Sequence, residues 1–517
     1  MGGAARELEL KIELTASGMR SVESDRRLAQ LALRPPQTRT LRSVYFDTPD
    51  QRLRAKGLSL RVRRVGRRWV QTVKAGTEVQ SGLSNPIEVE GEVHGTKPEL
   101  EAVHDGAVRR QIKKALDGSA LVPVFETVVH RTTRRLRAGK NGEIELALDE
   151  GVVRSPAGSR EIREAELELK SGPADSLLTV AEALFGDEHI RLAEKSKAER
   201  GYDLALGRPT EALKPLFASE PDLDKTQSCA AALRAILKVV ADQVLHNCQV
   251  VAETDEPEGA HQLRIGLRRL RSALRVFRPV ADSHHLRELD EKARDLGRVV
   301  GELRDADVLL DEVVAPAMAS GYGEPGFARL REALASERSG KRDHVKASLL
   351  SPRWSCFQLK LALLPKVGDW SAAASDDGAL LALPVRKHAR KALGRSWREV
   401  AQWAERIEEL TIEERHQMRK SLKSLRYAVE FFQSIFPAME SRRFLKELKW
   451  LQEIFGYLND VAMAKKAMEL SAKDSGAELQ RAMGYVLGWH AARADEAWTS
   501  ARVRWRRLES APRFWEA

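Results

Sequence analysis

The segment Glu7-Leu-Glu-Leu-Lys-Ile-Glu-Leu14 decides the fold of the first part of the chain, because charged and apolar residues alternate along it without a break. Successive side chains of a β-strand point to opposite faces, so this period of two predicts a strand with one charged and one apolar face. The same alternation returns in residues 58–63, 86–90, 143–148 and 164–169. Turn signals and helical stretches separate these segments, and we therefore predict an α+β domain over residues 1–206.

The second part of the chain has a different period. After residue 218, apolar residues recur at spacings of three and four, which is typical of amphipathic helices. Between the two parts stands Gly207-Arg-Pro-Thr-Glu-Ala-Leu-Lys-Pro215, whose two prolines are typical of a connecting segment. We predict a linker at residues 207–217 and an all-α domain at residues 218–517.

Two motifs of the helical part occur twice. His261-Gln-Leu-Arg-Ile-Gly-Leu-Arg-Arg-Leu-Arg271 matches His416-Gln-Met-Arg-Lys-Ser-Leu-Lys-Ser-Leu-Arg426, and Gly301-Glu-Leu-Arg-Asp305 matches Gly456-Tyr-Leu-Asn-Asp460. The offset is the same for both motifs, since 416 − 261 and 460 − 305 both give 155. A shared offset predicts a duplicated helical bundle, with repeat halves at about residues 218–365 and 380–510.

Composition excludes several classes of protein. The 517 residues include 86 Lys and Arg against 75 Asp and Glu, a net charge of +11, while an apolar content of 43% excludes a disordered polycation. The longest apolar runs fall far short of the roughly 20 residues of a membrane span, and no secretory signal stands at the start. The three cysteines form no CxxC pair, so neither a disulfide framework nor a zinc site is indicated. We expect a cytoplasmic protein with anionic partners and no membrane.

The charged strand faces carry an unusual distribution of sign. Carboxylates gather on some strands (Glu7 and Glu9, Glu88 and Glu90, Glu164, Glu166 and Glu168), whereas Arg61 and Arg63 share a face of another. A solvated surface is the ordinary explanation of a charged face. Closely spaced carboxylates repel one another unless a cation lies between them, and Mg²⁺ or Mn²⁺ takes such oxygen ligands. A sheet curled around these faces would form a tunnel for a metal and a polyphosphate substrate.

At this point the chain resembles a known family, the CYTH domains or triphosphate tunnel metalloenzymes. Glu7-Leu-Glu-Leu-Lys11 is similar to their ExExK signature, and further similar motifs follow in family order: Tyr45-Phe-Asp-Thr48, Leu60-Arg-Val-Arg-Arg64, Trp69-Val-Gln-Thr-Val-Lys74, Glu145-Leu-Ala-Leu-Asp-Glu-Gly151, Glu166-Leu-Glu-Leu-Lys170 and Lys195-Ser-Lys197. The resemblance implies an eight-stranded antiparallel tunnel barrel with its charged face inward. It also implies a hydrolase, a triphosphatase that uses Mg²⁺ or Mn²⁺.

The resemblance also assigns roles to residues. It implies metal binding by Glu7, Glu9, Glu166 and Glu168. It implies catalytic roles for Glu7, Glu9, Lys11, Glu90 and Glu145, with Glu88 as a further acidic tunnel position. It implies phosphate binding by Arg61, Arg63, Lys74, Arg131, Arg134 and Lys197. Tyr45 and Phe46 are expected to be packing residues.

The repeated motif places cations on one face of a helix. At about 100° per residue, one narrow arc holds His261, Arg264, Arg268 and Arg271, and the second copy repeats this with His416, Arg419, Lys423 and Arg426. A solvated helix mixes charges of both signs at these spacings, because like charges repel there. A cationic stripe that occurs in both copies favours a groove that binds a polyanion.

This half resembles the CHAD domain, a helical module associated with inorganic polyphosphate. The resemblance rests on the two histidine motifs, on Arg304-Asp-Ala-Asp-Val308 and on Leu458-Asn-Asp-Val461. It implies two similar four-helix bundles that face each other across a basic cleft, with Arg294 and Lys449 adding to the cleft. Asp305 and Asp460 are expected to orient the bases by salt bridges. The second copy has Asn459 in place of Arg304.

Nucleic acid is the rival ligand for basic helices, but neither stripe carries the interleaved aromatic residues that stack bases. The leading hypothesis is an enzyme that hydrolyses inorganic triphosphate or a related triphosphate, joined to a module that binds long-chain polyphosphate and can associate with polyphosphate granules. One alternative is a non-catalytic polyphosphate-binding scaffold. Another is an adenylate cyclase or thiamine triphosphatase of the same fold.

Overall fold

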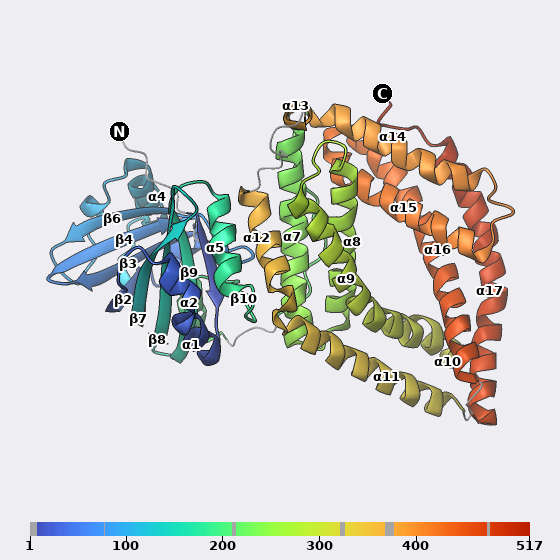
Figure 1. The fold of residues 1–517 in the computed structure, drawn as a ribbon, viewed down its shortest axis with the longest axis horizontal. Helices are drawn as coiled ribbons and strands as arrows, with labels where there is room; N and C mark the ends of the chain where they lie inside the picture. The colour runs from blue at the N-terminus through green and yellow to red at the C-terminus, as the bar shows by residue number, and fades with distance from the viewer. Residues whose placement is uncertain are drawn as a thin grey trace. The chain divides into compact units, whose positions relative to one another are not determined.

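The structure is a computed structural model that describes residues 8–76, 78–208, 213–320, 326–367, 377–472 and 476–516. The chain folds into two compact units (Figure 1). The N-terminal unit comprises Met1–Leu213 together with Leu349–Gly368, and the helical unit comprises Lys214–Ser348 and Asp369–Ala517. One short stretch of the second half thus belongs to the N-terminal unit. None of the described helices is both long enough and apolar enough to cross a membrane.

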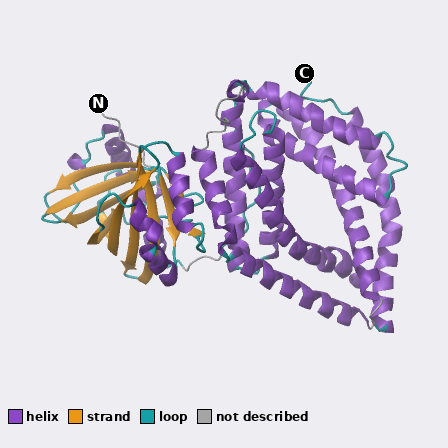
Figure 2. Cartoon of the chain, in the orientation of Figure 1, coloured by secondary structure: helices purple, strands orange, loops and turns teal. Residues whose placement is uncertain are grey.

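The N-terminal unit is built on one curled antiparallel sheet, shown in orange in Figure 2. Its eight strands of five or more residues are β1 (Glu9–Glu13), β2 (Gln37–Asp47), β3 (Leu58–Val65), β4 (Arg68–Ala75), β6 (Ile87–Val93), β7 (Val122–Ala138), β8 (Gly142–Ser155) and β9 (Gly158–Ser171). Two short strands, β5 (Leu83–Ser84) and β10 (Arg191–Leu192), extend it. The predicted antiparallel sheet with flanking helices is therefore confirmed.

The strand order shows how far the sheet closes. It runs β10-β1-β9-β8-β7-β2-β3-β4-β6, and β5 pairs with β1. Within the described residues β6 pairs with β4 alone, so the sheet curls into a half-barrel and its two edges are not joined by a ladder.

Strand register decides which residues face the concave side. Glu9 pairs with Glu168 and Lys11 with Glu166, so these charged side chains share one face of neighbouring strands. The alternate residues Leu10 and Ile12 are fully buried on the other face. The alternation seen in the sequence thus places the charged side chains on the concave face of the sheet and the apolar side chains on its convex face.

Helices cover the convex face of the sheet. They are α1 (Ala16–Ser24), α2 (Arg26–Leu31), α3 (Arg52–Ala55), α4 (Gly106–Leu116) and α5 (Asp175–Phe185), and a further helix, α12 (Ser355–Val367), lies on α5. Val108 and Ile112 of α4 pack against Leu60 of β3 in one apolar cluster. The helix α12 comes from the second half of the sequence and packs on α5, where the Lys360 ammonium lies 3.3 Å from a carboxylate oxygen of Glu182.

The helical unit contains the sequence repeat. Its long helices are α7 (Cys229–Glu253), α8 (Pro257–Phe277), α9 (His284–Asp307), α11 (Gly326–Leu349), α14 (Val385–Ala404), α15 (Ile412–Phe432), α16 (Ala438–Ala472) and α17 (Ala477–Ser510). Helices α8 and α15 both have 21 residues, and they begin 155 positions apart, at residues 257 and 412. The first copy is interrupted where the π-helical stretch η2 (Val308–Val314) and α10 (Ala315–Ser320) follow α9, while α16 runs through.

A short helix, α6 (Lys197–Ala205), lies against the concave side and is held there by close packing. Its Gly201 sits directly over the ring of Phe125 on β7, so a Cβ at this position would lie 2.1 Å from a ring carbon. Phe125 is itself stacked on Tyr45, with ring centroids 4.4 Å apart, and cannot move freely. The N-terminal residues of α6, Ser196 and Lys197, line the cavity described next.

The first prediction follows from this contact. Gly201→Ala should destabilise the N-terminal unit by about 1–3 kcal/mol, because the added methyl group overpacks the α6–β7 contact. Thermal or denaturant unfolding followed by circular dichroism measures the change. Gly106→Ala is the matched control, since a Cβ there meets only the end of Arg110 at 3.6 Å. Equal stability of the two variants would contradict the packing argument.

Candidate functional site

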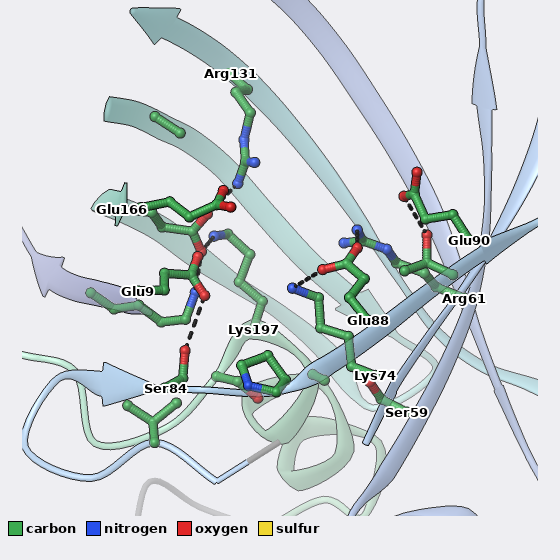
Figure 3. A pocket seen from close by; sticks show the side chains of 18 of the residues that line it. Glu9, Ser59, Arg61, Lys74, Ser84, Glu88, Glu90, Arg131, Glu166 and Lys197 are labelled. Carbon is green, nitrogen blue, oxygen red and sulfur yellow. Dashed lines mark hydrogen bonds and ion pairs between the residues drawn. The ribbon is translucent and has the colours of Figure 1, made fainter. Parts of the chain in front are cut away.

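The concave side of the N-terminal sheet encloses a cavity of about 510 Å³ (Figure 3). Among the residues predicted from sequence, those that line it are Glu9, Lys11, Arg61, Arg63, Lys74, Glu88, Glu90, Arg131, Glu145, Glu166, Glu168 and Lys197. They come from β1, β3, β4, β6, β7, β8, β9 and the start of α6. Glu7 lies outside the described residues.

Arg134 is the exception among the predicted phosphate-binding residues. It does not line the cavity, whereas Arg131 on the same strand does. The two residues are three positions apart in the continuous ladder of β7 with β8, so they point to opposite faces of the sheet. The sequence-based choice of Arg134 is therefore corrected. Arg135 lies on the concave face instead, where its Nε is 3.0 Å from Glu145.

The acidic wall of the cavity is centred on Glu166, whose two carboxylate oxygens are both bonded to cations. Lys11 Nζ lies 2.5 Å and Lys197 Nζ 2.8 Å from Oε1, and Arg131 donates to Oε2 at 2.5 Å. Lys11 also lies 2.7 Å from Glu9. Figure 3 shows Glu9, Glu166, Arg131 and Lys197 directed toward one another.

Burial and these neighbours act in opposite directions on protonation. Burial alone would raise the pKa of Glu166, but Lys11, Lys197 and Arg131 outweigh it and hold that pKa well below its usual range. Burial would lower the pKa of Lys11, and the carboxylates of Glu166 and Glu9 outweigh it and raise that pKa. Glu166 and Lys11 are therefore both ionised at neutral pH, although only 8% of Glu166 and 7% of Lys11 is exposed.

Two further carboxylates, Asp149 and Glu164, lie beneath the cavity, and sequence reasoning did not assign them to the site. Asp149, Glu164 and Glu166 bring their oxygens within 4.8 Å of one another. The Lys197 ammonium lies among them, 2.7 Å from Asp149 and in contact with Glu164. Arg200 of α6 also pairs with Glu164. Glu164 belongs to the alternating segment 164–169 and Asp149 to the motif 145–151, but nothing in the sequence indicates that either side chain is buried.

The basic wall faces the acidic one from β3, β4 and β6. Lys74 Nζ lies 2.6 Å and Arg61 3.6 Å from carboxylate oxygens of Glu88. Arg63 donates to Glu90 at 2.9 Å, and the Thr72 hydroxyl donates to the same oxygen at 3.1 Å. Arg61 and Lys74 thus share Glu88, and Arg63 pairs with Glu90. These cations therefore form a ready site for phosphoryl oxygens.

Several carboxylates are placed so that they could hold a hard cation. Glu9, Glu168 and Glu145 are register neighbours across β1, β9 and β8, on the concave face. Such neighbours have Cβ atoms about 5 Å apart, and oxygen donors alone suit Mg²⁺ or Mn²⁺.

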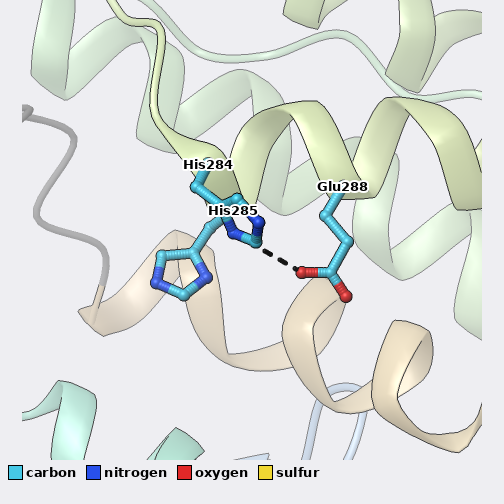
Figure 4. Close-up of side chains that lie close together, drawn as sticks. All are labelled: His284, His285 and Glu288. Atoms are coloured by element: carbon cyan, nitrogen blue, oxygen red, sulfur yellow. Dashed lines mark ion pairs between the residues drawn. The ribbon is translucent and has the colours of Figure 1, made fainter.

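A separate surface cluster, His284, His285 and Glu288 at the start of α9 (Figure 4), lines neither described cavity.

The cavity also contains residues that the sequence did not single out for the site. Its lining includes Tyr45, Ser59, Thr72, Ser84, Lys170 and Ser196. The Ser84 hydroxyl donates to Glu9 at 3.0 Å, and Lys170 pairs with Glu168. Ser84 belongs to the two-residue strand β5, which has too few residues for any periodicity to reveal it.

The helical unit encloses a second, basic cleft, with a volume of about 720 Å³, between α8, α9, α15 and α16. Predicted residues that line it are Arg264, Arg268, Arg271, Arg294, His416, Arg419 and Lys423. Further cations there are Arg275, Arg298 and Lys420. His261, Arg426 and Lys449 were predicted and are not among the lining residues. Arg426 and Lys449 instead approach Glu430, at 2.8 and 3.8 Å.

Cations in this cleft outnumber the acids that could balance them. Arg264 donates to Asp305 at 2.6 Å, and Arg419 lies 3.6 Å from Asp460, as predicted for the two aspartates. Among the residues that the structure describes, no acid forms an ion pair with Lys423. Burial, and then Arg268 and Arg419, lower the pKa of Lys423 to about 5. A bound anion would relieve this repulsion.

The two histidine motifs differ in their surroundings at the position where the second copy has Asn459 in place of Arg304. His416 Nδ1 lies 2.5 Å from the Asn459 side-chain oxygen and faces the cleft. In the first copy Arg304 stands at the equivalent position and pairs with Glu312. Burial and then Arg304 lower the pKa of His261. The two copies therefore share a fold but differ in the residue beside the histidine, which is Arg304 in the first copy and Asn459 in the second.

Two family models match separate parts of the chain. A family model of the CYTH domain matches residues 5–202. A family model of the CHAD domain matches residues 235–469. The crystal structure of the CHAD domain from the plant Ricinus communis is 27% identical, with a TM-score of 0.50, and covers 58% of this chain and 99% of that chain.

Two curated relatives are similar to parts of the chain. An inorganic triphosphatase of Haemophilus influenzae is 29% identical over 199 residues, which are 38% of this chain and 54% of that protein. An uncharacterised protein of Mycobacterium tuberculosis is 27% identical over 374 residues, which are 66% of each chain. The chain thus spans between about half and two thirds of the length of these relatives.

Proposed function

The chain carries a CYTH domain followed by a CHAD domain, and we propose that the first hydrolyses a terminal phosphoryl group of a triphosphate while the second binds inorganic polyphosphate. The observation that carries the first part is the cavity with an acidic and a basic wall of paired carboxylates and cations, of which Glu9, Lys11 and Glu166 are buried. Phosphoryl transfer requires positioning and charge neutralisation more than covalent chemistry, and both are supplied by such a cavity. The similarity to an inorganic triphosphatase supports the proposal.

In this proposal the basic wall binds the substrate. Arg61, Arg63 and Lys74 exchange their bonds to Glu88 and Glu90 for bonds to phosphoryl oxygens, and Arg131 and Lys197 contribute from the opposite wall. Arginine suits this role because its planar group binds phosphate by two parallel bonds. The freed glutamates Glu88 and Glu90 can then orient an attacking water and accept its proton.

The donor set of the acidic wall fits a divalent cation, Mg²⁺ or Mn²⁺. Glu9, Glu166, Glu168 and Glu145 would hold it, together with Glu7 by its place in the sequence motif. Such a cation neutralises charge that develops on the phosphoryl oxygens. Among the described residues that line the cavity there is no cysteine and no histidine, and the carboxylates offer oxygen donors, which favours these hard cations over zinc.

The lining of the cavity favours an inorganic triphosphate over a nucleotide. Tyr45 is the one aromatic residue among the described lining residues, and its ring already stacks on Phe125. A nucleobase or a thiamine ring would need an apolar or aromatic surface beside the phosphate site. Faster turnover of ATP or thiamine triphosphate than of tripolyphosphate would instead indicate an adenylate cyclase or a thiamine triphosphatase.

The second prediction concerns turnover. With Mg²⁺ or Mn²⁺ the protein should release phosphate from tripolyphosphate faster than from ATP, thiamine triphosphate or long polyphosphate. Glu9→Gln and Arg61→Ala should each lower kcat/KM by about 100-fold or more, because each removes a charge that stabilises the transition state. Arg134→Ala is the matched control and should retain the wild-type rate, since Arg134 lies on the opposite face. Wild-type rates in Glu9→Gln would exclude the cavity as the active site.

The proposed polyphosphate site is the cleft of the helical unit. Its cations come from both sequence copies, with Arg264 and Arg268 on α8 and Arg419 and Lys423 on α15. A polyanion that follows both helices would replace the repulsion between these cations by attraction.

A scaffold function without catalysis would keep this cleft and lose turnover. Tethering would also raise the local substrate concentration and bring the chain to polyphosphate deposits in the cytoplasm.

The third prediction concerns affinity and salt. Arg264→Ala combined with Arg419→Ala should weaken the binding of long polyphosphate by at least about tenfold and reduce the slope of log affinity against log salt, because fewer counterions are released. Fluorescence anisotropy with labelled polyphosphate measures both. Lys449→Ala is the control, since Lys449 does not line the cleft. Unchanged affinity in the double variant would place the binding site elsewhere.

The fourth prediction concerns pH. The free Lys423 is uncharged at neutral pH because its pKa is lowered to about 5, and a bound polyanion raises that pKa. Binding therefore takes up a proton, so affinity falls as pH rises above about 5, by up to tenfold per pH unit. Lys423→Met should flatten this dependence between pH 5.5 and 8.5. The variant retains His416, so the difference between the two profiles isolates Lys423, and identical profiles would contradict the assignment.

A further inference from the structure

We propose that the Lys11 ammonium occupies the metal-binding carboxylates of the substrate-free protein, so that the metal ion and the oligophosphate bind cooperatively and each binds weakly alone. The inference rests on the proposed function of the N-terminal cavity and assigns a regulatory role to one of its residues. It makes Lys11 a positioning residue whose partner changes when the cavity is loaded.

The position of Lys11 supports this role. It projects from β1 between Glu9 and Glu166, at 2.7 and 2.5 Å from their oxygens, and both glutamates belong to the acidic set that could hold a cation. All three side chains are at least nine-tenths buried. A divalent ion between Glu9 and Glu166 would meet the Lys11 ammonium within a few ångströms, and this repulsion opposes metal binding in the absence of substrate.

Lys197 is held differently and should keep its place. Its ammonium contacts Asp149 and Glu164 as well as Glu166. Asp149 and Glu164 lie beneath the cavity and do not line it. When Glu166 turns to another cation, Lys197 therefore retains two carboxylate partners, whereas Lys11 would lose both of its own. Lys11 is the cation that must find a new partner, and a phosphoryl oxygen in the cavity supplies one.

The charge balance of the cavity leads to the same conclusion. Its described lining holds seven cationic side chains, Lys11, Arg61, Arg63, Lys74, Arg131, Lys170 and Lys197, against six acidic ones, Glu9, Glu88, Glu90, Glu145, Glu166 and Glu168. The unloaded cavity is nearly neutral. A divalent cation alone adds positive charge, and an oligophosphate alone adds negative charge, each at a desolvation cost. The two together leave a smaller net charge in the cavity than either ligand alone, which is the thermodynamic basis of positive coupling.

Binding of Mn²⁺ tests the inference without turnover. Electron paramagnetic resonance or calorimetry should show that Mn²⁺ binds the wild-type protein at least tenfold more tightly in the presence of a methylene-bridged triphosphate analogue than in its absence. The affinity of the analogue alone is measured in parallel, because coupling must act equally in both directions. Lys11→Gln should bind Mn²⁺ alone at least tenfold more tightly than the wild type, and its coupling to the analogue should shrink.

The control is Lys74→Gln, which removes the same charge from the opposite wall and should leave the affinity for Mn²⁺ alone near the wild-type value. If Mn²⁺ and the analogue together fail to bind the wild type, the proposed function itself fails. If they bind but Lys11→Gln gives no gain for Mn²⁺ alone, only the role of Lys11 is overturned. Should Lys11→Gln and Lys11→Met both fail to fold by circular dichroism, equal wild-type affinity for Mn²⁺ with and without the analogue would still overturn it.

Discussion

The mutual neutralisation of buried cations and carboxylates on the concave face is the constraint on which the N-terminal unit depends. Removing one ionised side chain from water is costly unless an opposite charge and hydrogen bonds replace the solvent. Glu166 meets this condition with three cations, and Lys197 meets it with three carboxylates. The helical unit presents the opposite case, since burial and then the neighbouring cations lower the pKa values of Lys423 and Arg268.

Much of the fold could be predicted from the sequence, because its period follows the environment of each face. Strands β1, β3, β8 and β9 alternate between the charged concave side and the apolar convex side, and their positions were predicted from that pattern alone. Strand β7 shows no regular alternation in the sequence. On its concave face Val129 packs in an apolar cluster with residues of α6, whereas Arg131 lines the cavity, so the same face carries both apolar and charged residues. In the helical unit the offset of 155 residues identified the matching pair α8 and α15.

The site was less fully predictable, since a motif carries no information on depth or direction. Arg134 was chosen by similarity in a basic stretch, yet a spacing of three from Arg131 places it on the other side of the strand. Asp149 and Glu164 resemble surface acids in sequence, and only the fold shows that they are fully buried beneath Glu166. Arg426 and Lys449 have the spacing of the cleft residues, but Glu430 draws them away from it.

The packing of α12 on α5 has a consequence for how the protein can be divided. Residues 349–368 complete the N-terminal unit although some 135 positions of helical sequence precede them. A fragment cut at the predicted linker would lack Phe357 and Leu361, both buried in the intact chain, and would leave a stripe of α5 uncovered. The two modules are therefore interleaved along the polypeptide, so recombination or limited proteolysis at a single point cannot yield two finished halves.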